Sequence, residues 1–192
     1  MTQASPSHWA DAIEGPFPLH DADVGEVWRL LHAADGEFIP PLSARESSTV
    51  QELSEPDPTR LRTAPEGPRE YFASMREQQF LLVRDEQGAV IAFMSFRPDY
   101  ELPVQGFDAP CWYITTLVVD PPHRRRGISR ALYAVMLHAA QLADRLVATR
   151  TWSTNDGHLA LLDQLGFRVL ERLVDDRGPG LDTLYLVREE DA

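Results

Sequence analysis

The sequence predicts a mixed α/β fold with helices on the faces of a central, mixed but mostly antiparallel sheet. Residues 112–152 have the pattern of a strand, a turn, a helix and a second strand, a unit whose crossover is right-handed and whose strands are parallel. Apolar runs separated by turn residues at 80–97 and at 167–188 predict two antiparallel hairpins. The chain therefore combines one parallel pair with antiparallel neighbours.

Composition narrows the class of protein. A chain of 192 residues with 43% hydrophobic residues is expected to form one domain over 1–192. Its net charge of −12 argues against nucleic acid as the main partner and weakly favours cationic substrates. The longest apolar run, Ala89 to Phe96, is too short to cross a membrane, and a lone Cys111 allows no internal disulfide. We therefore expect a cytoplasmic protein without membrane contact, with Cys111 as a small apolar residue rather than a nucleophile.

The N-terminal part predicts little regular structure. Residues 1–15 are expected to be a flexible lead-in, and Phe17 to His20 a short strand. Asp23 and Glu26 have the spacing of a capping box for a helix that ends near Ala34. The Pro-rich segment 36–69 is expected to be irregular, apart from a helical turn near Val50 to Leu53, and either a substrate-side wall or a mobile connector.

The middle of the chain predicts a helix followed by a hairpin. Glu70 to Gln78 is expected to be helical, and Phe80 to Arg84 pairs with Ala89 to Arg97. The connection Pro98 to Pro110 leads into the next strand and carries three carboxylates that are expected near one end of it: Asp99, Glu101 and Asp108.

The central strand runs into a turn that is dense in arginine. Tyr113 to Val119 alternates β-branched residues, which predicts a strand buried on both faces and stopped by Pro121. The following helix has apolar residues at three- and four-residue steps: Ile128, Leu132, Val135, Met136, Ala139 and Leu142. A helix N-terminus with Gly127 and the small Ser129 favours pyrophosphate binding, the alternative being a solvated arginine patch.

The last part predicts a strand, a helix and a hairpin. Leu146 to Trp152 is expected to be a strand, with Trp152 near the substrate. Ser153 or Thr154 would cap a helix from Asn155 to Leu165, and Gly166 would end it in a left-handed conformation. The closing antiparallel hairpin is expected to pair Phe167 to Val174 with Asp182 to Arg188.

Two motifs resemble those of one family. Val119, Pro121, Arg124, Gly127 and Ser129 are similar to the pattern V-x-P-x-x-[RQ]-x-x-G-x-[GA] of the GNAT superfamily of acyl-CoA N-acyltransferases, whose loop holds the pyrophosphate of coenzyme A. Ser129 departs from the usual Gly or Ala. The resemblance implies a GNAT-like fold, acetyl-CoA as co-substrate without a metal, and these CoA-binding residues: Leu117, Val118, Val119, Arg124, Arg125, Arg126, Gly127, Ile128, Ser129, Arg130 and Asn155.

The second motif spans residues 155–167 and resembles N-x-x-A-x-x-L-Y-x-x-x-G-F of the same family. Asn155 would hydrogen-bond the pantetheine arm, or would serve only as a helix cap. His158 replaces the common alanine, and Leu162 stands where many members have a tyrosine proposed to protonate the departing thiolate. The acid role would then pass to another group, and the candidates are Ser153, His158 and Tyr185.

The resemblance also implies a mechanism, in which a neutral amine attacks the thioester directly. A β-bulge around Thr115 to Leu117 would free an N–H group for the oxyanion. Glu101 is the candidate base, with Asp99 and Asp108 beside it, although loop carboxylates are usually only solvated. His20, His32 and His138 have no partner at metal-ligand spacing, so no metal is expected.

These features predict an acetyl-CoA-dependent N-acetyltransferase that acts on a primary amine of a small molecule, with a homodimer compatible with the resemblance. Three alternatives stay open: acylation of a peptide or protein amine, an acyl-CoA-binding module without catalysis, and a nucleotide-binding domain that uses phosphates alone.

Overall fold

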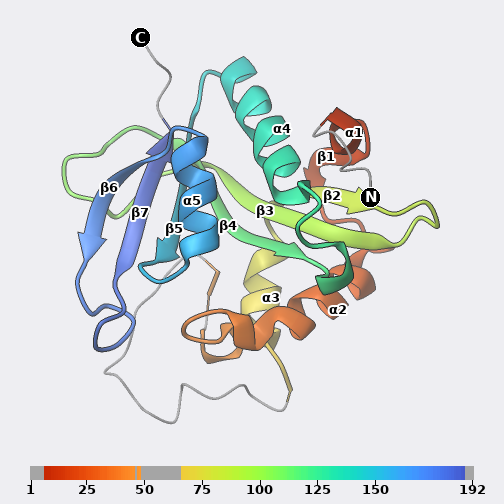
Figure 1. Cartoon of the computed structure of the whole chain (residues 1–192), viewed down its shortest axis with the longest axis horizontal. Coiled ribbons are helices and arrows are strands. Elements are labelled where there is room, and N and C mark those ends of the chain that lie inside the picture. Colours follow the sequence, from red (N-terminus) through yellow and green to blue (C-terminus); the bar gives the residue numbers. More distant parts are fainter. Residues whose placement is uncertain (1–6, 46, 49–65, 189–192) are drawn as a thin grey trace.

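The computed structural model describes residues 7–45, 47–48 and 66–188. Its strands form one seven-stranded sheet in the order β1–β2–β3–β4–β5–β7–β6 (Figure 1). Within the described residues the pair β4–β5 is parallel and the other neighbours are antiparallel, so the predicted mixed sheet is confirmed. The strands are β1 (Ile13–Pro18), β2 (Gln79–Arg84), β3 (Val90–Tyr100), β4 (Cys111–Val119), β5 (Leu146–Trp152), β6 (Arg168–Leu173) and β7 (Thr183–Arg188).

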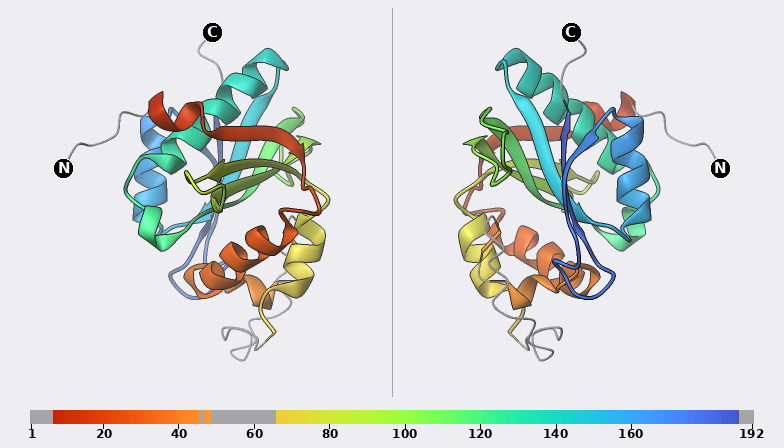
Figure 2. Two further views of the ribbon diagram at one scale, coloured as in Figure 1. Left: turned by 90° about the vertical axis from the view of Figure 1, so that its right-hand side faces the viewer. Right: turned by 90° about the vertical axis from the view of Figure 1, so that its left-hand side faces the viewer.

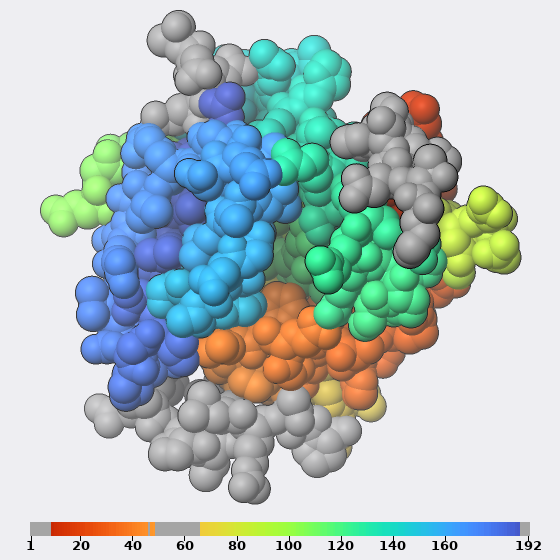
Figure 3. Space-filling model, in the orientation of Figure 1, coloured from red at the N-terminus to blue at the C-terminus, as the bar shows by residue number. Residues whose placement is uncertain are grey.

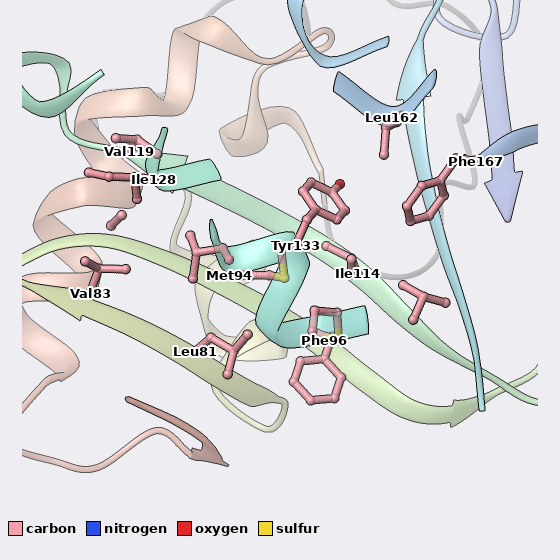
Figure 4. Close-up of a cluster of buried hydrophobic side chains, with 14 of the residues drawn as sticks. Leu81, Val83, Met94, Phe96, Ile114, Val119, Ile128, Tyr133, Leu162 and Phe167 are labelled. Atoms are coloured by element: carbon pink, nitrogen blue, oxygen red, sulfur yellow. The ribbon is translucent and has the colours of Figure 1, made fainter. Parts of the chain in front are cut away.

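Helices cover both faces of the sheet (Figure 2). The helices α4 (Ile128–Leu142) and α5 (Asp156–Gln164) pack on one face, where Figure 4 shows the core beneath α4. The helices α2 (Val24–Ala34) and α3 (Arg69–Met75) pack on the other, with the short helices η1 (Asp35–Glu37) and η2 (Leu42–Ala44) beside them. No helix in the described part of the chain is long and apolar enough to cross a membrane.

The buried face of α4 is close to the predicted one. Ile128, Leu132 and Met136 are buried as expected. Leu142 is 76% exposed, so its predicted burial is wrong, because α4 ends at this residue and its last turn projects beyond the sheet. Tyr133 is buried instead, between the helix and the sheet.

The N-terminal region is more regular than predicted. A short helix α1 (Ser7–Ala10) and β1, which begins at Ile13, occupy the described part of the expected lead-in. Trp9 lies against the cluster beneath α4, and its Nε1 donates a hydrogen bond to the Arg126 carbonyl at 2.9 Å. Residues 7–15 therefore contain a short helix and the start of a strand where no regular element was expected, and Trp9 packs partly on the core.

Neither of the two predicted N-terminal helix caps forms. Asp23 lies at the N-terminus of α2 without a side-chain cap and accepts a hydrogen bond from Arg84 at 2.7 Å, while Glu26 accepts one from the backbone N–H of Val90. The Ser153 hydroxyl accepts a hydrogen bond from the backbone N–H of Asp182 at 3.1 Å, and Asn155 takes the N-cap position of α5. Tertiary partners have replaced the local ones in both places.

Strand β4 changes its pairing midway. Ser95 lies opposite Thr116 and Phe96 opposite Ile114, so Thr115 is the extra residue of a β-bulge, as predicted. On its other edge, β4 pairs with β5 only as far as Ile114, which lies opposite Thr149. Residues 115–119 therefore have one edge without a strand partner among the described residues.

The Pro-rich segment is described in part. Its described residues form η1, η2 and the approach to α3, and this irregular structure agrees with the expectation. The predicted turn at Val50 to Leu53 lies outside the described residues.

Candidate active site

A cavity of about 670 Å³ opens where β4 and β5 separate. Its walls come from the second half of β4, the end of β5, the N-terminus of α4, one side of α5 and the segment around η1. In Figure 3 the surface is hollowed between α5 in light blue and the loop 124–130 in green, above residues near η1 in orange. Segments that are far apart in the sequence thus meet at one groove.

The loop before α4 has the geometry of an anion site. Arg125 has a φ of 61° and Gly127, the N-cap, has a φ of 84°, so the backbone turns through two left-handed residues into the helix. A Cβ on Gly127 would meet nothing within 4 Å, which leaves the approach to the first-turn N–H groups open. His123 also lines the cavity, with its buried Nδ1 lacking a hydrogen-bond partner among the described residues. These groups fit a pyrophosphate.

The side chains around this loop have distinct tasks. The Arg124 side chain is held by protein groups, because its Nε donates a hydrogen bond to the Val119 carbonyl at 2.9 Å and its Nη2 donates one to Glu37 at 2.8 Å. Nearly all predicted CoA-binding residues line the cavity, the exception being Arg126, whose carbonyl is held by Trp9. Trp9 was missed as a support for the loop, since nothing local in the sequence ties it to a residue more than a hundred positions away.

Asn155 and His158 meet at Thr151, in the wall formed by β5 and α5. The Asn155 amide donates to the Thr151 hydroxyl at 3.0 Å, and His158 Nδ1 lies 3.4 Å from the same oxygen. Asn155 makes no side-chain cap bond to α5, so capping does not explain its place at the cavity. Burial lowers the pKa of His158 to about 4, and the ring is therefore neutral at pH 7.

Tyr133 is a cavity residue that the sequence analysis missed. Its hydroxyl lies 2.7 Å from His158 Nε2, and its ring packs on Phe167 at 5.7 Å between centroids. Leu162, which holds the position of the family's tyrosine, is fully buried in the same hydrophobic cluster as Tyr133 (Figure 4). Burial raises the pKa of Tyr133, so the phenol keeps its proton at neutral pH.

The other predicted acids lie outside the cavity lining. Ser153 is bonded to the turn before β7, and Tyr185 on β7 is buried and hydrogen-bonded to Arg150. Of the three predicted acids, His158 is the one that the structure brings to the cavity.

The predicted carboxylates are also elsewhere. Strand β3 extends to Tyr100, which pairs with Cys111 at the start of β4. The loop with Glu101 and Asp108 therefore lies at the start of β4, whereas the loop 124–130 follows its end. Glu101 is exposed, and Asp99 accepts a hydrogen bond from Arg145 at 2.5 Å. None of these carboxylates lines the cavity. The carboxylate that does is Glu37, and it is paired with Arg124.

Neither a reactive thiol nor a metal-binding group is found among the described residues. Cys111 is buried at the start of β4, and burial raises the pKa of its thiol to about 12, which suits a small apolar residue rather than a nucleophile. In the ranges that the structure describes, no group of three or more His, Cys, Asp or Glu residues could hold a metal ion.

Solved structures share this fold. A candidate phosphinothricin N-acetyltransferase is 19% identical over 94% of this chain and 98% of that chain, with a TM-score of 0.60. The NatC complex bound to Gag peptide and CoA gives 17% identity, 93% and 99% coverage, and a TM-score of 0.61. Naa20 from Chaetomium thermophilum, in complex with a bisubstrate analogue, is 22% identical, and the match covers 57% of this chain but 64% of that one, with a TM-score of 0.50.

The sequence comparisons give the family. No curated protein sequence matches the chain. A model of the acetyltransferase (GNAT) family matches residues 47–167, which is more than half of the 192 residues and includes β4, the arginine loop, α4 and α5. With this match and the fold, the chain belongs to the GNAT family of acetyltransferases, a class of acyltransferase enzymes.

Proposed function

We propose that this protein transfers an acetyl group from acetyl-CoA to a primary amine of a small molecule. The observation that supports the proposal most is the cavity itself, which joins the free edge of β4 beyond Ile114 to the open N-terminus of α4. A pantetheine arm can pair with such an edge as an added strand, while the loop amides and arginines bind the pyrophosphate. CoA is bound in the NatC structure, which has the same fold.

The residues have separate parts in the proposed transfer. The first-turn amides of α4 and the side chains of Arg125 and Arg130 hold the phosphates, and Leu117, Val119 and Asn155 hold the pantetheine arm. Backbone N–H groups at the Thr115 bulge face the thioester carbonyl and stabilise its oxyanion. The amine nitrogen bonds to the carbonyl carbon as the C–S bond breaks, which yields an amide and a thiolate.

Two protons then have to move. We assign the thiolate proton to Tyr133, because Tyr133 lines the cavity and its phenol stays protonated at neutral pH, and solvent then returns a proton to the phenolate. Among the described residues that line the cavity, no carboxylate is free to act as the base, since Glu37 is paired with Arg124. The proton lost by the amine therefore passes to solvent, either before or after the attack.

Thermal unfolding with and without acetyl-CoA tests the cofactor part of the proposal. At 100 times Kd the ligand should stabilise the fold by about 2.7 kcal/mol, a rise in Tm of about 5 to 10 °C for this size. Gly127→Asp should abolish that rise, because its carboxylate would occupy the anion site. Gly88→Asp is the matched control, since Gly88 also has a positive φ of 86° and open space around it but lies in the β2–β3 turn.

Release of free thiol from acetyl-CoA, measured with a panel of amines, tests the transfer. Release that depends on a small amine supports the proposal, and release only with peptides of free N-terminus would move the acceptor to the peptide class. A protein that is stabilised by acetyl-CoA but releases no thiol with any amine would be a binding module. Absence of any thermal shift at millimolar acetyl-CoA would sink the proposal as a whole.

A further inference from the structure

Three arginines from distant segments meet at the cavity. Arg45 follows η2, Arg150 lies in the middle of β5, and Arg177 lies in the turn between β6 and β7. All three line the cavity. Arg177 is only 5% exposed, which is unusual for an arginine without an acidic partner.

The three guanidinium groups are bonded to neutral groups. Arg45 donates to the Pro40 carbonyl at 2.8 Å, Arg177 donates to the Thr183 hydroxyl at 2.9 Å, and Arg150 bonds to the Tyr185 hydroxyl. Among the residues that the structure describes, none of the three forms a salt bridge with a carboxylate.

Burial of these like charges together is costly. Desolvation, together with repulsion between the arginines, lowers the pKa of Arg45 to about 10 and that of Arg177 to about 9. Arg84 gives the contrast in the same chain, since Glu14 and Asp23 flank it and raise its pKa. A buried cluster of cations is stabilised when an anion enters it and neutralises part of the charge.

The cluster lies beside the bulge of β4. Arg150 follows Thr149, whose hydroxyl donates to the Ile114 carbonyl at 3.1 Å, next to the bulged Thr115. Successive side chains of a strand point to opposite faces, so Arg150 and Thr151, the partner of Asn155, face opposite sides of the sheet. Arg150 therefore lies on the other side of the sheet from the Thr151 side chain that contacts Asn155.

Taking acetyl transfer to an amine as proposed above, we infer that Arg45, Arg150 and Arg177 bind an oxyanion of the acceptor. The acceptor class is a small amine that carries a carboxylate or a phosphonate, as an amino acid does. Arginine forks suit such groups because they donate two parallel hydrogen bonds to them. The weak expectation of a cationic substrate, drawn from the net charge, does not hold at this cavity, where the lining arginines outnumber the one lining carboxylate.

Matched pairs of amines test the inference through thiol release at saturating acetyl-CoA. One pair is an amino acid and its carboxamide, and the other is 2-aminoethylphosphonate and ethanolamine, so the two arms distinguish carboxylate from phosphonate. We expect the anionic member of at least one pair to have a kcat/KM about 30-fold higher or more. Equal or better turnover of the uncharged members would overturn the inference while leaving acetyl transfer intact.

Variants of Arg150 show which residue carries the preference. Arg150 has the fewest structural bonds of the three, so Arg150→Gln should reduce the ratio within a pair to about threefold or less and leave the KM for acetyl-CoA unchanged. Arg150→Lys should keep part of the preference. Arg69→Gln is the control. Arg69 is the first residue of α3, its side chain is 70% exposed, and it pairs with Glu66. A rise in the KM for acetyl-CoA alone would place Arg150 in the CoA site and overturn the assignment.

A binding measurement keeps the inference testable if no amine is turned over. Thermal unfolding of the protein with CoA and each member of a pair should show stabilisation by the anionic member only. Equal stabilisation by both members, or by neither at millimolar concentration, would contradict the inference. If acetyl transfer itself fails, the anionic amine will still stabilise the protein against thermal unfolding, but no thiol will be released.

Discussion

Tyr133 and Leu162 are neighbours in the core below the cavity, and together they bear on how the thiolate is protonated (Figure 4). Leu162 has no proton to give, but Tyr133 on α4 carries a hydroxyl and is among the residues that line the cavity. His158 Nε2, at 2.7 Å, fixes the orientation of that hydroxyl. In the proposed mechanism Tyr133 on α4 supplies the proton that Leu162 on α5 cannot supply.

Removal of the hydroxyl should slow the transfer. Tyr133→Phe keeps the ring on Phe167 and should reduce kcat by about 100-fold, the lower end of general-acid effects, because a thiolate is a tolerable leaving group. The KM for acetyl-CoA should stay within about twofold in the same steady-state assay.

Tyr100→Phe is the control for this experiment. Tyr100 stacks on Tyr113 at 4.8 Å, outside the cavity lining, so its hydroxyl should have no effect on kcat. An unchanged kcat in Tyr133→Phe would mean that water protonates the thiolate and that Tyr133 serves only packing.

At the scale of single elements, β1 forms the edge of the sheet farthest from the cavity, and one glycine fits it there. Gly15 has a φ of 112°, and a Cβ on it would lie 2.3 Å from the Phe80 carbonyl oxygen on β2. Gly15→Ala should therefore lower the free energy of unfolding by about 2 to 4 kcal/mol. Chemical denaturation measures this change.

The site should be insensitive to the same substitution. The Tm rise caused by acetyl-CoA should be unchanged in Gly15→Ala, because β4 and β5 lie two strands or more away. Gly25→Ala in α2 is the matched control, since its Cβ would meet nothing within 4 Å and should stabilise the fold by up to about 1 kcal/mol. Loss of acetyl-CoA binding in Gly15→Ala would show that the edge strand and the cavity are coupled.

Elements with local signals could be predicted from the sequence. The helix α4, the left-handed Gly166 and the parallel pair β4–β5 follow from periodicity, turn residues and crossover rules. The bulge at Thr115 was expected from the family resemblance rather than from its residues. The loop 124–130 could be recognised as a phosphate-binding loop because the residues that form it are consecutive in the sequence.

What failed were inferences that depend on tertiary partners. Asp23 and Glu26 have capping-box spacing, but Arg84 and the Val90 amide compete for the two carboxylates. Glu101 was expected at the acceptor side, whereas the extension of β3 to Tyr100 places its loop at the other end of β4. Tyr133 was not part of the apolar face predicted for its helix, and its partner His158 is 25 residues away.

At the scale of the whole molecule, the charge of the cavity lining is opposite in sign to the net charge of the chain. The chain has a net charge of −12, yet six arginines and one carboxylate are among the described residues that line the cavity. The net surface charge says little about the ligand, because short-range pairing inside a cavity is screened far less than long-range surface charge. Net charge alone therefore did not predict the charge of the cavity lining.

One buried group should link global stability to pH. His158 has its pKa lowered from 6.5 to about 4 by burial, so the folded protein binds fewer protons than the unfolded chain between these values. Its contribution to stability is complete above pH 6.5 and is lost as the pH falls toward 4. At pH 5 the loss should be about 2 kcal/mol.

The variant His158→Gln separates this contribution from that of the carboxylates. Glutamine stays neutral and can still hydrogen-bond Tyr133, so the variant should lose less stability than the wild-type protein between pH 7 and pH 5, with a difference of about 2 kcal/mol. Urea unfolding at half-unit steps of pH measures both curves. Parallel curves would mean that the imidazole is protonated in the folded state without cost, and His158 would then be available as a cation beside the thiolate rather than as the neutral partner of Tyr133.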